Sequence, residues 1–288
     1  MIILGMAFPG ALGEDERYSS NGFVYKLHED GTAEVVRCNL TDVKTDAKIV
    51  IPEQLDGHPV TAIDDWAFFP CDGLTEIVIP DSVVTIIPDS VVTMGYNPFW
   101  NCPLLKRIVV SPDHPVLATI DGVLFDKTKK SLLCYPRGLT AGYYEIPRGI
   151  VEIGDGAFWA CDSLTEIVIP NGITSIGDRA FGSCDSLTEV VIPNGVTSIG
   201  DSAFWACDSL TKIVIPNGVT SIGDRAFECC DSLTEVVIPD SVTSIGLFAF
   251  GQCDMLTLTV GRDSYAAEYA KNNGITYTYP DANDWLND

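Results

Sequence analysis

The sequence predicts a solenoid, in which 23-residue units made of short parallel strands and short helical turns stack between two caps. Three observations support this fold class. The chain repeats itself at a fixed spacing, each unit holds one short alternating apolar segment, and both ends of the chain depart from the repeat. A fixed period of about 20–29 residues is typical of solenoids. Cysteine marks the period at Cys161, Cys184, Cys207, Cys230 and Cys253.

The first part of each unit predicts a strand. Ile167 and Ile169 alternate with Val168, which is the pattern of a short strand with one face buried. Pro170 follows, and it ends the strand because proline cannot donate to a strand ladder. We therefore expect the isoleucines in the core and the intervening valine at the surface.

The second part of the unit returns the chain to its starting edge. Asn171-Gly172 predicts a turn, after which Ile176 enters the core again. We expect Asp178 to cap a single helical turn that carries Phe181 inward, and Cys184 to close the unit. A single unit cannot bury its own apolar face, so neighbouring units must stack and both ends must be capped.

We divide the chain into four parts. Residues 1–21 form a leader, 22–48 an N-terminal cap hairpin, 49–257 the repeat array, and 258–288 a C-terminal cap and tail. The array contains an irregular hairpin unit at 103–150. These boundaries follow the points at which the repeat pattern begins, breaks and ends.

The caps have their own local signals. Phe23–Cys38 predicts a hairpin that turns at Glu29-Asp30-Gly31. At the other end, Ser264–Asn273 predicts a short helix with Ser264 as its N-cap, and Gly274 stops it. A last strand is expected at residues 275–279.

Two irregularities interrupt the array. The segment Ile79–Ile86 is followed at once by a near-copy, Ile87–Met94, which lengthens one unit. Further on, Gly122–Asp126 and Ser131–Tyr135 predict a hairpin whose turn, Lys127–Lys130, is basic.

The full unit reads Leu-x-x-Ile-x-Ile-Pro-x-x-Val-x-x-Ile-Gly-x-x-Ala-Phe-x-x-Cys-x-x-Leu. This pattern resembles the BspA-like, or Treponema-type, bacterial leucine-rich repeats (LRR). Ile120–Asp126 with Tyr135-Pro136 resembles the irregular unit common in that family, and Ser264–Ala270 resembles its usual C-terminal cap. The resemblance covers about Gly22 to Tyr279 and implies a right-handed leucine-rich repeat solenoid.

The same resemblance implies an exported protein, secreted or held at the cell surface of a bacterium that is often anaerobic and host-associated. Some members look like adhesins for host matrix proteins or other microbes. The partner implied is therefore a protein or a glycan, on a host or microbial surface. The alternative is a structural envelope or scaffold protein that has no discrete ligand.

Charge excludes some classes of partner. The formal net charge is −23, and residues 151–253 hold fourteen Asp and Glu against three Lys and Arg. Nucleic-acid backbones and anionic membrane surfaces are bound by basic footprints, so neither is expected as a partner. No stretch reaches the roughly 18–20 apolar residues that span a bilayer, so we expect no membrane insertion, and we expect a monomer.

The first thirteen residues allow two interpretations. They are apolar, and Ala11 and Gly13 suit a signal-peptidase site, although a basic n-region is missing. The first interpretation is the remnant of a secretory signal. The second is a short apolar strand that caps the solenoid.

The outward residues of the strands form the main candidate binding surface, because solenoids bind through such extended faces. A plain solvated sheet face is the alternative. The basic island expected at Lys106, Arg107 and the hairpin turn would orient an acidic partner. The candidate residues are Glu166, Val168, Glu189, Val191, Lys212, Val214, Glu235, Val237, Lys106, Arg107, Lys127, Lys129 and Lys130.

A second candidate surface is aromatic. Trp159 and Trp205 follow the core phenylalanines of their units, as Phe69 and Trp100 do in earlier units, and we expect them near the surface. They would form a patch for carbohydrate or protein. The same position in the intervening unit is Gly182.

Cysteine and aspartate each form columns that allow more than one role. We expect the cysteines to be buried thiols, because parallel side chains keep their Cβ atoms farther apart than a disulfide needs. For the pair Cys229-Cys230, only Cys230 is expected to point inward. The aspartates of the columns that contain Asp178 and Asp185 are expected to cap turns, with calcium binding as the alternative.

Catalysis finds little support in the sequence. His28, His58 and His114 lie in separate turns, and the chain contains no nucleophile elbow, phosphate-binding loop or paired-histidine zinc motif. No Cys-x-x-Cys pair is present. We therefore expect a non-enzymatic protein that uses no cofactor or metal.

Overall fold

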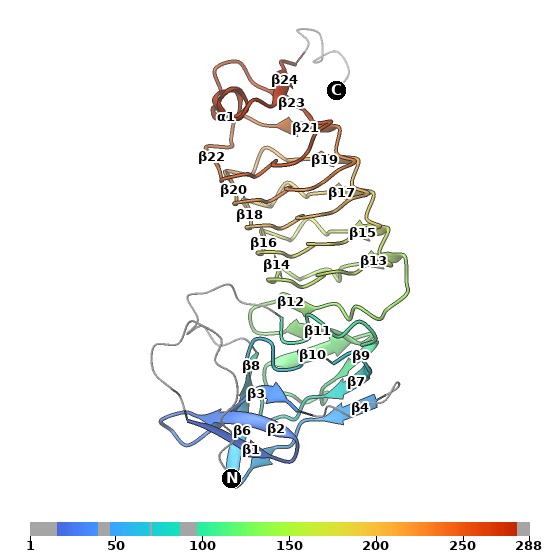
Figure 1. The fold of residues 1–288 in the computed structure, drawn as a ribbon, viewed down its shortest axis with the longest axis vertical. Coiled ribbons are helices and arrows are strands. Elements are labelled where there is room, and N and C mark those ends of the chain that lie inside the picture. Colours follow the sequence, from blue (N-terminus) through green and yellow to red (C-terminus); the bar gives the residue numbers. More distant parts are fainter. Residues whose placement is uncertain (1–15, 40–46, 70, 87–96, 281–288) are drawn as a thin grey trace.

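The computed structural model describes residues 16–39, 47–69, 71–86 and 97–280. These residues form a β-solenoid of about ten turns, with repeats of about 23 residues and one C-terminal helix (Figure 1). The predicted fold class is confirmed. The near-copy predicted at residues 87–94 and the leader residues 1–15 lie outside the described residues.

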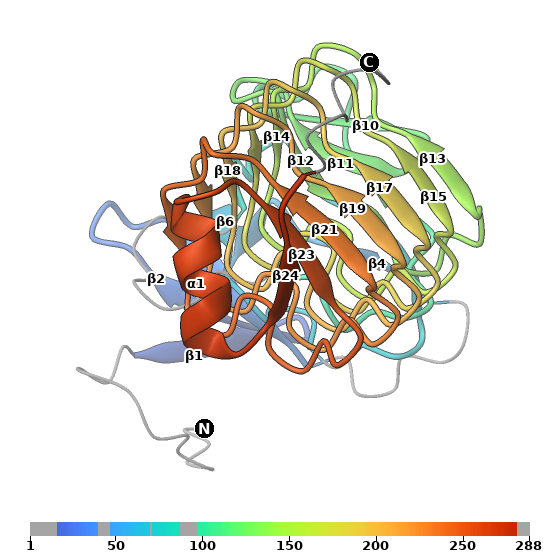
Figure 2. The same ribbon diagram turned by 90° about the horizontal axis from the view of Figure 1, so that it is seen from above.

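One side of the solenoid carries the first strand of each unit, and we call it the strand face. A three-stranded parallel sheet lies toward the N-terminus, and a seven-stranded parallel sheet continues the same side (Figures 1 and 2). The first sheet comprises β4 (Ala47–Val50), β7 (Leu74–Val78) and β9 (Arg107–Val109). The second comprises β13 (Tyr143–Glu145), β15 (Glu166–Val168), β17 (Glu189–Val191), β19 (Lys212–Val214), β21 (Glu235–Ile238), β23 (Thr257–Val260) and β24 (Thr276–Thr278).

The second extended piece of each unit stacks into another sheet. It contains eight strands, of which the last five are two-residue rungs paired in parallel at 23-residue intervals. Its members are β10 (Leu117–Ile120), β11 (Val123–Asp126), β12 (Ser131–Cys134), β14 (Glu152–Ile153), β16 (Ser175–Ile176), β18 (Ser198–Ile199), β20 (Ser221–Ile222) and β22 (Ser244–Ile245). The predicted hairpin of the irregular unit is confirmed as antiparallel β11 and β12, which β10 extends.

The third side of each unit consists of consecutive tight turns, and the helical turn predicted after Asp178 is absent from it. Arg179 and Ser183 have φ of +54°, in the left-handed region, which interrupts a right-handed helix. Backbone bonds run between rungs instead, as from Phe181 N–H to Ala203 O at 2.7 Å. The turn backbone therefore satisfies its donors along the solenoid axis. We call this third side the outer face.

The core matches the inward residues predicted from the repeat. Ile167, Ile169, Ile176, Phe181 and Cys184 are all buried. The core phenylalanines stack face to face at successive rungs, with ring centroids 5.0–5.3 Å apart. The regular 23-residue period thus places identical side chains above one another. The rings of one continuous stack are those of Phe158, Phe181, Phe204, Phe227 and Phe250.

Both predicted caps are present. The N-terminal hairpin is formed by antiparallel β2 (Phe23–Leu27) and β3 (Ala33–Cys38). β3 also pairs in parallel with β6 of the first rung, so the sheet continues into the solenoid. At the C-terminus, α1 (Tyr265–Asn273) begins at Ser264, whose hydroxyl accepts the Ala267 N–H at 3.1 Å. Gly274 ends α1 with φ +68°, and β24 follows as the predicted last strand.

The N-terminal cap begins earlier than the sequence predicted. β1 (Arg17–Ser20), within the segment expected as leader, pairs antiparallel with β2. The remaining strands of the cap region are β5 (Gln54–Leu55), β6 (His58–Ile63) and β8 (Thr85–Ile86). A tight turn joins β1 to β2, and its two residues, Asn21 and Gly22, have positive φ angles of +52° and +83°.

Candidate functional site

The strand face exposes a column of aliphatic side chains. In β15 and its equivalents the first and third residues are exposed and the middle one is buried, as the alternation predicted. Val191 is 64% exposed, and the valines at the same position of the adjacent rungs are 38% and 45% exposed. The exposed column, on successive strands β15 to β21, consists of Val168, Val191, Val214 and Val237, while Val50 is exposed on β4 in the other sheet.

Charged residues flank this column on the same face. Glu166 and Glu189 are register partners, and Lys212 lies in register between Glu189 and Glu235. Carboxylates on adjacent strands repel each other, and Lys212 separates Glu189 from Glu235 but leaves Glu166 directly beside Glu189. The C-terminal half of the strand face is therefore acidic.

The N-terminal half of the strand face holds a cross-strand ion-pair network. Glu76 on β7 pairs with Lys48 Nζ at 2.7 Å and accepts a bond from Arg107 Nε at 3.0 Å. These two cations hold the pKa of Glu76 below its usual range. Because Lys106 is exposed as well, this half of the face is basic.

The structure separates the two groups of basic residues that the sequence predicted to form one island. The Gly122 turn lies against Arg107, whose Cα is 3.2 Å from an ideal Cβ at Gly122. Lys127, Lys129 and Lys130 are exposed, but they follow the far end of β11. A four-residue strand rises roughly 13 Å, so the two basic groups occupy different sides of the irregular unit.

A shallow depression lies beside the valine column, and the sequence did not reveal it. It is about 560 Å³ in volume and lies where β13 and β15 end. Arg148 and Glu145 bring charge to it from the irregular unit, and Val168 borders it. Its full lining is Glu145, Arg148, Gly149, Val168, Ile169, Pro170, Asn171 and Gly172.

The predicted aromatic patch is larger than the sequence indicated. Trp159 and Trp205, two units apart, stack with ring centroids 5.8 Å apart and planes within 6°. Trp159 also packs on Trp100 at 5.3 Å, and Trp100 packs on Trp66 at 4.7 Å. Sequence reasoning missed Trp66, because it precedes the core phenylalanine instead of following it. We call this set the aromatic ridge: Trp66, Phe69, Trp100, Trp159 and Trp205.

The cysteines behave as a buried column of thiols. All ten cysteines of the chain are free, and Cys230 is buried while Cys229 is half-buried, as predicted. Each thiol in the regular column donates to a backbone carbonyl one unit back, as Cys184 Sγ does to Phe158 O at 3.0 Å. Burial raises the pKa of Cys184 to about 12. These contacts give the column a structural role.

The first aspartate column has a different role from the predicted helix cap. The Asp178 carboxylate Oδ1 accepts the backbone N–H of Asp201 on the next rung at 2.8 Å. The same bond joins Asp155 to Asp178 and Asp201 to Asp224. The prediction failed because the acceptor lies one rung away in space and 23 residues away in sequence. Within the described ranges, no group of three or more Cys, His, Asp or Glu is placed to hold a metal ion.

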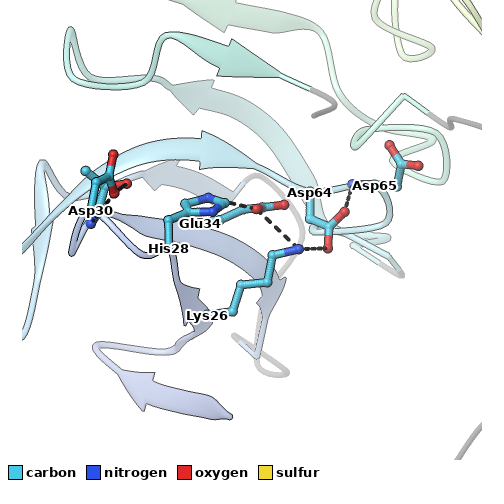
Figure 3. A network of polar contacts seen from close by, with 7 residues as sticks. Lys26, His28, Asp30, Glu34, Asp64 and Asp65 are labelled. Atoms are coloured by element: carbon cyan, nitrogen blue, oxygen red, sulfur yellow. Dashed lines mark hydrogen bonds and ion pairs between the residues drawn. The ribbon is translucent and has the colours of Figure 1, made fainter. Parts of the chain in front are cut away.

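The N-terminal cap contains a buried ionic cluster that the sequence did not indicate. Glu34 is fully buried, and its Oε2 lies 3.3 Å from Lys26 Nζ and 3.0 Å from His28 Nε2 (Figure 3). Lys26 also reaches Asp64 at 3.7 Å, immediately after β6. Burial raises the pKa of Glu34. The cluster therefore ties the cap hairpin to the first rung.

Comparison with known proteins agrees with this architecture. The family model described as the BspA type leucine rich repeat region matches in six copies, over residues 47–130 and 134–257. The chain belongs to the BspA-type leucine-rich repeat family. Members of the BspA-type family are generally binding scaffolds and not enzymes. No curated protein matches the sequence.

Solved structures share the BspA-type fold at low identity. A leucine-rich cell surface protein of Faecalibacterium prausnitzii A2-165 is 22% identical, with TM-score 0.55 and coverage of 92% of this chain and 98% of that one. The pneumococcal vaccine antigen PcpA is 16% identical, with TM-score 0.58 and coverage of 93% and 99%. A leucine-rich repeat protein of Eubacterium ventriosum is 20% identical, with TM-score 0.56 and coverage of 82% and 88%.

In the part of the chain that the structure describes, no helix is long and apolar enough to cross a membrane.

Proposed function

We propose that this BspA-type protein is an exported bacterial surface protein that binds a protein partner through its strand face. Membership of the family supports this proposal. So do the names of two similar structures, a cell surface protein and a vaccine antigen. The observation that carries the proposal is the exposed valine column, in which Val191 is 64% and Val214 45% exposed.

A valine column flanked by charges suits a protein partner. The four side chains from Val168 to Val237 lie on successive rungs about 4.8 Å apart and form a continuous apolar strip. Glu166 and Glu189 border this strip, and Lys212 interrupts the acidic row. An apolar centre with a polar rim is the usual anatomy of a protein interface. The strip would supply the buried centre, and the charges would set the register of the partner.

The charge distribution would also orient the partner. The strand face is basic around Lys106 and Arg107 and acidic from Glu145 to Glu235. Charged rims act mainly on the association rate, whereas buried apolar contacts act mainly on dissociation. The exposed turn at Lys127–Lys130 would add to steering without entering the interface.

The experiment is an array of matrix proteins and glycans probed with the purified protein, followed by kinetics on any protein that binds. Val191→Thr with Val214→Thr keeps β-branched side chains and removes the apolar strip, so we expect a dissociation rate at least tenfold higher. Replacing Lys127, Lys129 and Lys130 with Ala should slow association and flatten its salt dependence. Thr197→Val with Thr220→Val, on the side of the second sheet, is the matched control and should change neither rate.

The outcomes separate the two function classes. A bound protein whose dissociation rate is unchanged by the Val191→Thr and Val214→Thr substitutions would contradict the strand-face proposal. An array with no bound protein or glycan would favour the structural scaffold, since such a protein needs no discrete ligand.

A further inference from the structure

The aromatic ridge is continuous along the outer face, on a different side of the solenoid from the valine column. Phe69 is 39% exposed and Trp66 36%, and the other members of the ridge, Trp100, Trp159 and Trp205, are half-buried. Ring contacts of 4.7–6.1 Å link all five residues. Four rung steps of about 4.8 Å give the ridge a length of about 20 Å.

Two local features make this continuity possible. An ideal Cβ on Gly182 would clash with Trp159 Cζ3, so glycine at this position lets the Trp159 ring lie across that rung and reach Trp205. On the outer face the irregular unit adds no rung, because Gly156 lies directly against Asn97, with 3.7 Å between an ideal Cβ and Asn97 Cβ. Trp100 therefore meets Trp159 although 59 positions separate them in the chain.

Carboxylates border the ridge on both sides. One column, which contains Asp178 and Asp201, lies four residues before the tryptophan position, and another, which contains Asp185 and Asp208, lies three residues after it. Arg137 pairs with Asp162 at 3.0 Å, at the start of the second column. Asp185 and Asp208 are exposed and make no ion pair with any described residue.

The electrostatics of the second column agree with an excess of negative charge. Burial and the nearby charges of Asp208 and Asp162 raise the pKa of Asp185. Burial and Asp231 raise the pKa of Asp208 in the same direction. Crowded carboxylates are stabilised by an added cation, so a positively charged ligand beside the ridge would reduce the repulsion between these aspartates.

We propose that the aromatic ridge is a second binding site, which takes an arginine-rich segment of a partner protein. Guanidinium groups stack on indole faces, and their N–H groups can pair with a neighbouring carboxylate in the same contact. An extended segment advances about 3.3 Å per residue, so about six residues cover the ridge. Charge complementarity favours this occupant, because a neutral glycan can donate hydroxyl hydrogen bonds to the flanking aspartates but cannot neutralise their charge.

The test uses the full chain and a synthetic nona-arginine peptide, with nona-lysine as the comparison peptide. Tryptophan fluorescence and calorimetry should show the arginine peptide binding at least fivefold more tightly, because only guanidinium is planar and stacks. Trp159→Leu with Trp205→Leu should remove that preference. Gly182→Ala keeps both indoles but displaces Trp159, so it should weaken arginine-peptide binding severalfold.

A matched pair of charge variants separates the site from general acidity. Asp185→Asn with Asp208→Asn, beside the ridge, should weaken binding at least fivefold. Glu29→Gln with Asp113→Asn removes the same charge at two exposed positions outside both proposed sites and should have little effect. Equal losses in the two variants, unchanged binding in the leucine variant, or tryptophan-dependent binding of a neutral oligosaccharide would overturn the proposal. Urea unfolding of each variant confirms that the fold is retained.

Discussion

The carboxylate of Asp178 accepts the backbone N–H of Asp201, 2.8 Å away on the next rung. The bond repeats up the array and ends at Asp224, which accepts the Leu247 N–H at 2.7 Å. Asp178, Asp201 and Asp224 therefore each donate a backbone N–H to the rung before and accept one from the rung after. The resulting ladder runs along the turns of the outer face, where regular strand pairing is absent.

Breaking one bond of this ladder should destabilise the array. Asp178→Ala leaves the Asp201 N–H without its acceptor, and we expect a loss of about 1–3 kcal/mol of unfolding free energy. Asp178→Asn retains an oxygen at the same position and should lose less than half as much. Asp185→Ala, on the exposed neighbouring column, is the control. Urea titration measures all three, and equal losses for Asp178→Ala and Asp185→Ala would contradict the ladder.

The same column should give a pH dependence of defined sign. Burial raises the pKa of Asp155 and Asp178 above the usual 3.8. A carboxyl with a raised folded pKa stabilises the fold below its unfolded pKa, and this contribution is lost as the pH rises through the folded value. The stability of Asp178→Asn, which cannot ionise, should therefore shift in the variant's favour, relative to the natural protein, as the pH rises above about 4.

Glu76 provides the opposite case and serves as the control for that experiment. Its ion pairs with Lys48 and Arg107 lower its pKa, so its contribution is present above the unfolded value and is lost at lower pH. Glu76→Gln should therefore lose stability relative to the natural protein as the pH rises. If the unfolding midpoints of Asp178→Asn and Glu76→Gln changed with pH in the same way, the opposite pKa shifts assigned to Asp178 and Glu76 would be wrong.

Removing one ring from the phenylalanine stack should be costly. Phe204 is fully buried and stacks on Phe181 at 5.1 Å and on Phe227 at 5.3 Å. We expect Phe204→Ala to lose about 3–5 kcal/mol, since large-to-small core substitutions also leave a cavity. Phe248→Ala, at a 57% exposed position, is the control and should lose less than about 1 kcal/mol. A denaturant titration with a loss below that value for Phe204→Ala would refute its inward position.

The thiols should be reduced and protected. Titration under denaturing, non-reducing conditions should recover nearly all ten thiols. In the native protein we expect half-buried Cys229 to react first. Column members such as Cys230 are protected, because burial raises the pKa of the thiol and the thiol donates a hydrogen bond to a backbone carbonyl. Cys229→Ser should remove the fast native phase. Recovery of only two to four thiols after unfolding would show that disulfides exist.

The sequence by itself determined the repeating part of this protein. A 23-residue period places equivalent residues on one another, so Ile167, Phe181 and Cys184 could be assigned to the core from one unit. The caps were predicted as well, because a turn at Asp30 and a helix cap at Ser264 are local signals. Local propensity and periodicity suffice for such features, since neighbouring residues or neighbouring copies carry all the information.

Only the tertiary structure decided the contacts between rungs and across the irregular unit. The acceptor of each Asp178-type bond lies on another rung, so the cap predicted from local sequence was replaced by a ladder. Trp100 meets Trp159 because the irregular unit adds no rung to the outer face, and Arg107 is separated from Lys129 by the length of β11. The pairing of Glu34 with Lys26 and His28 likewise depends on how the cap packs. These features depend on distances between segments far apart in the chain, which packing sets and local sequence does not encode.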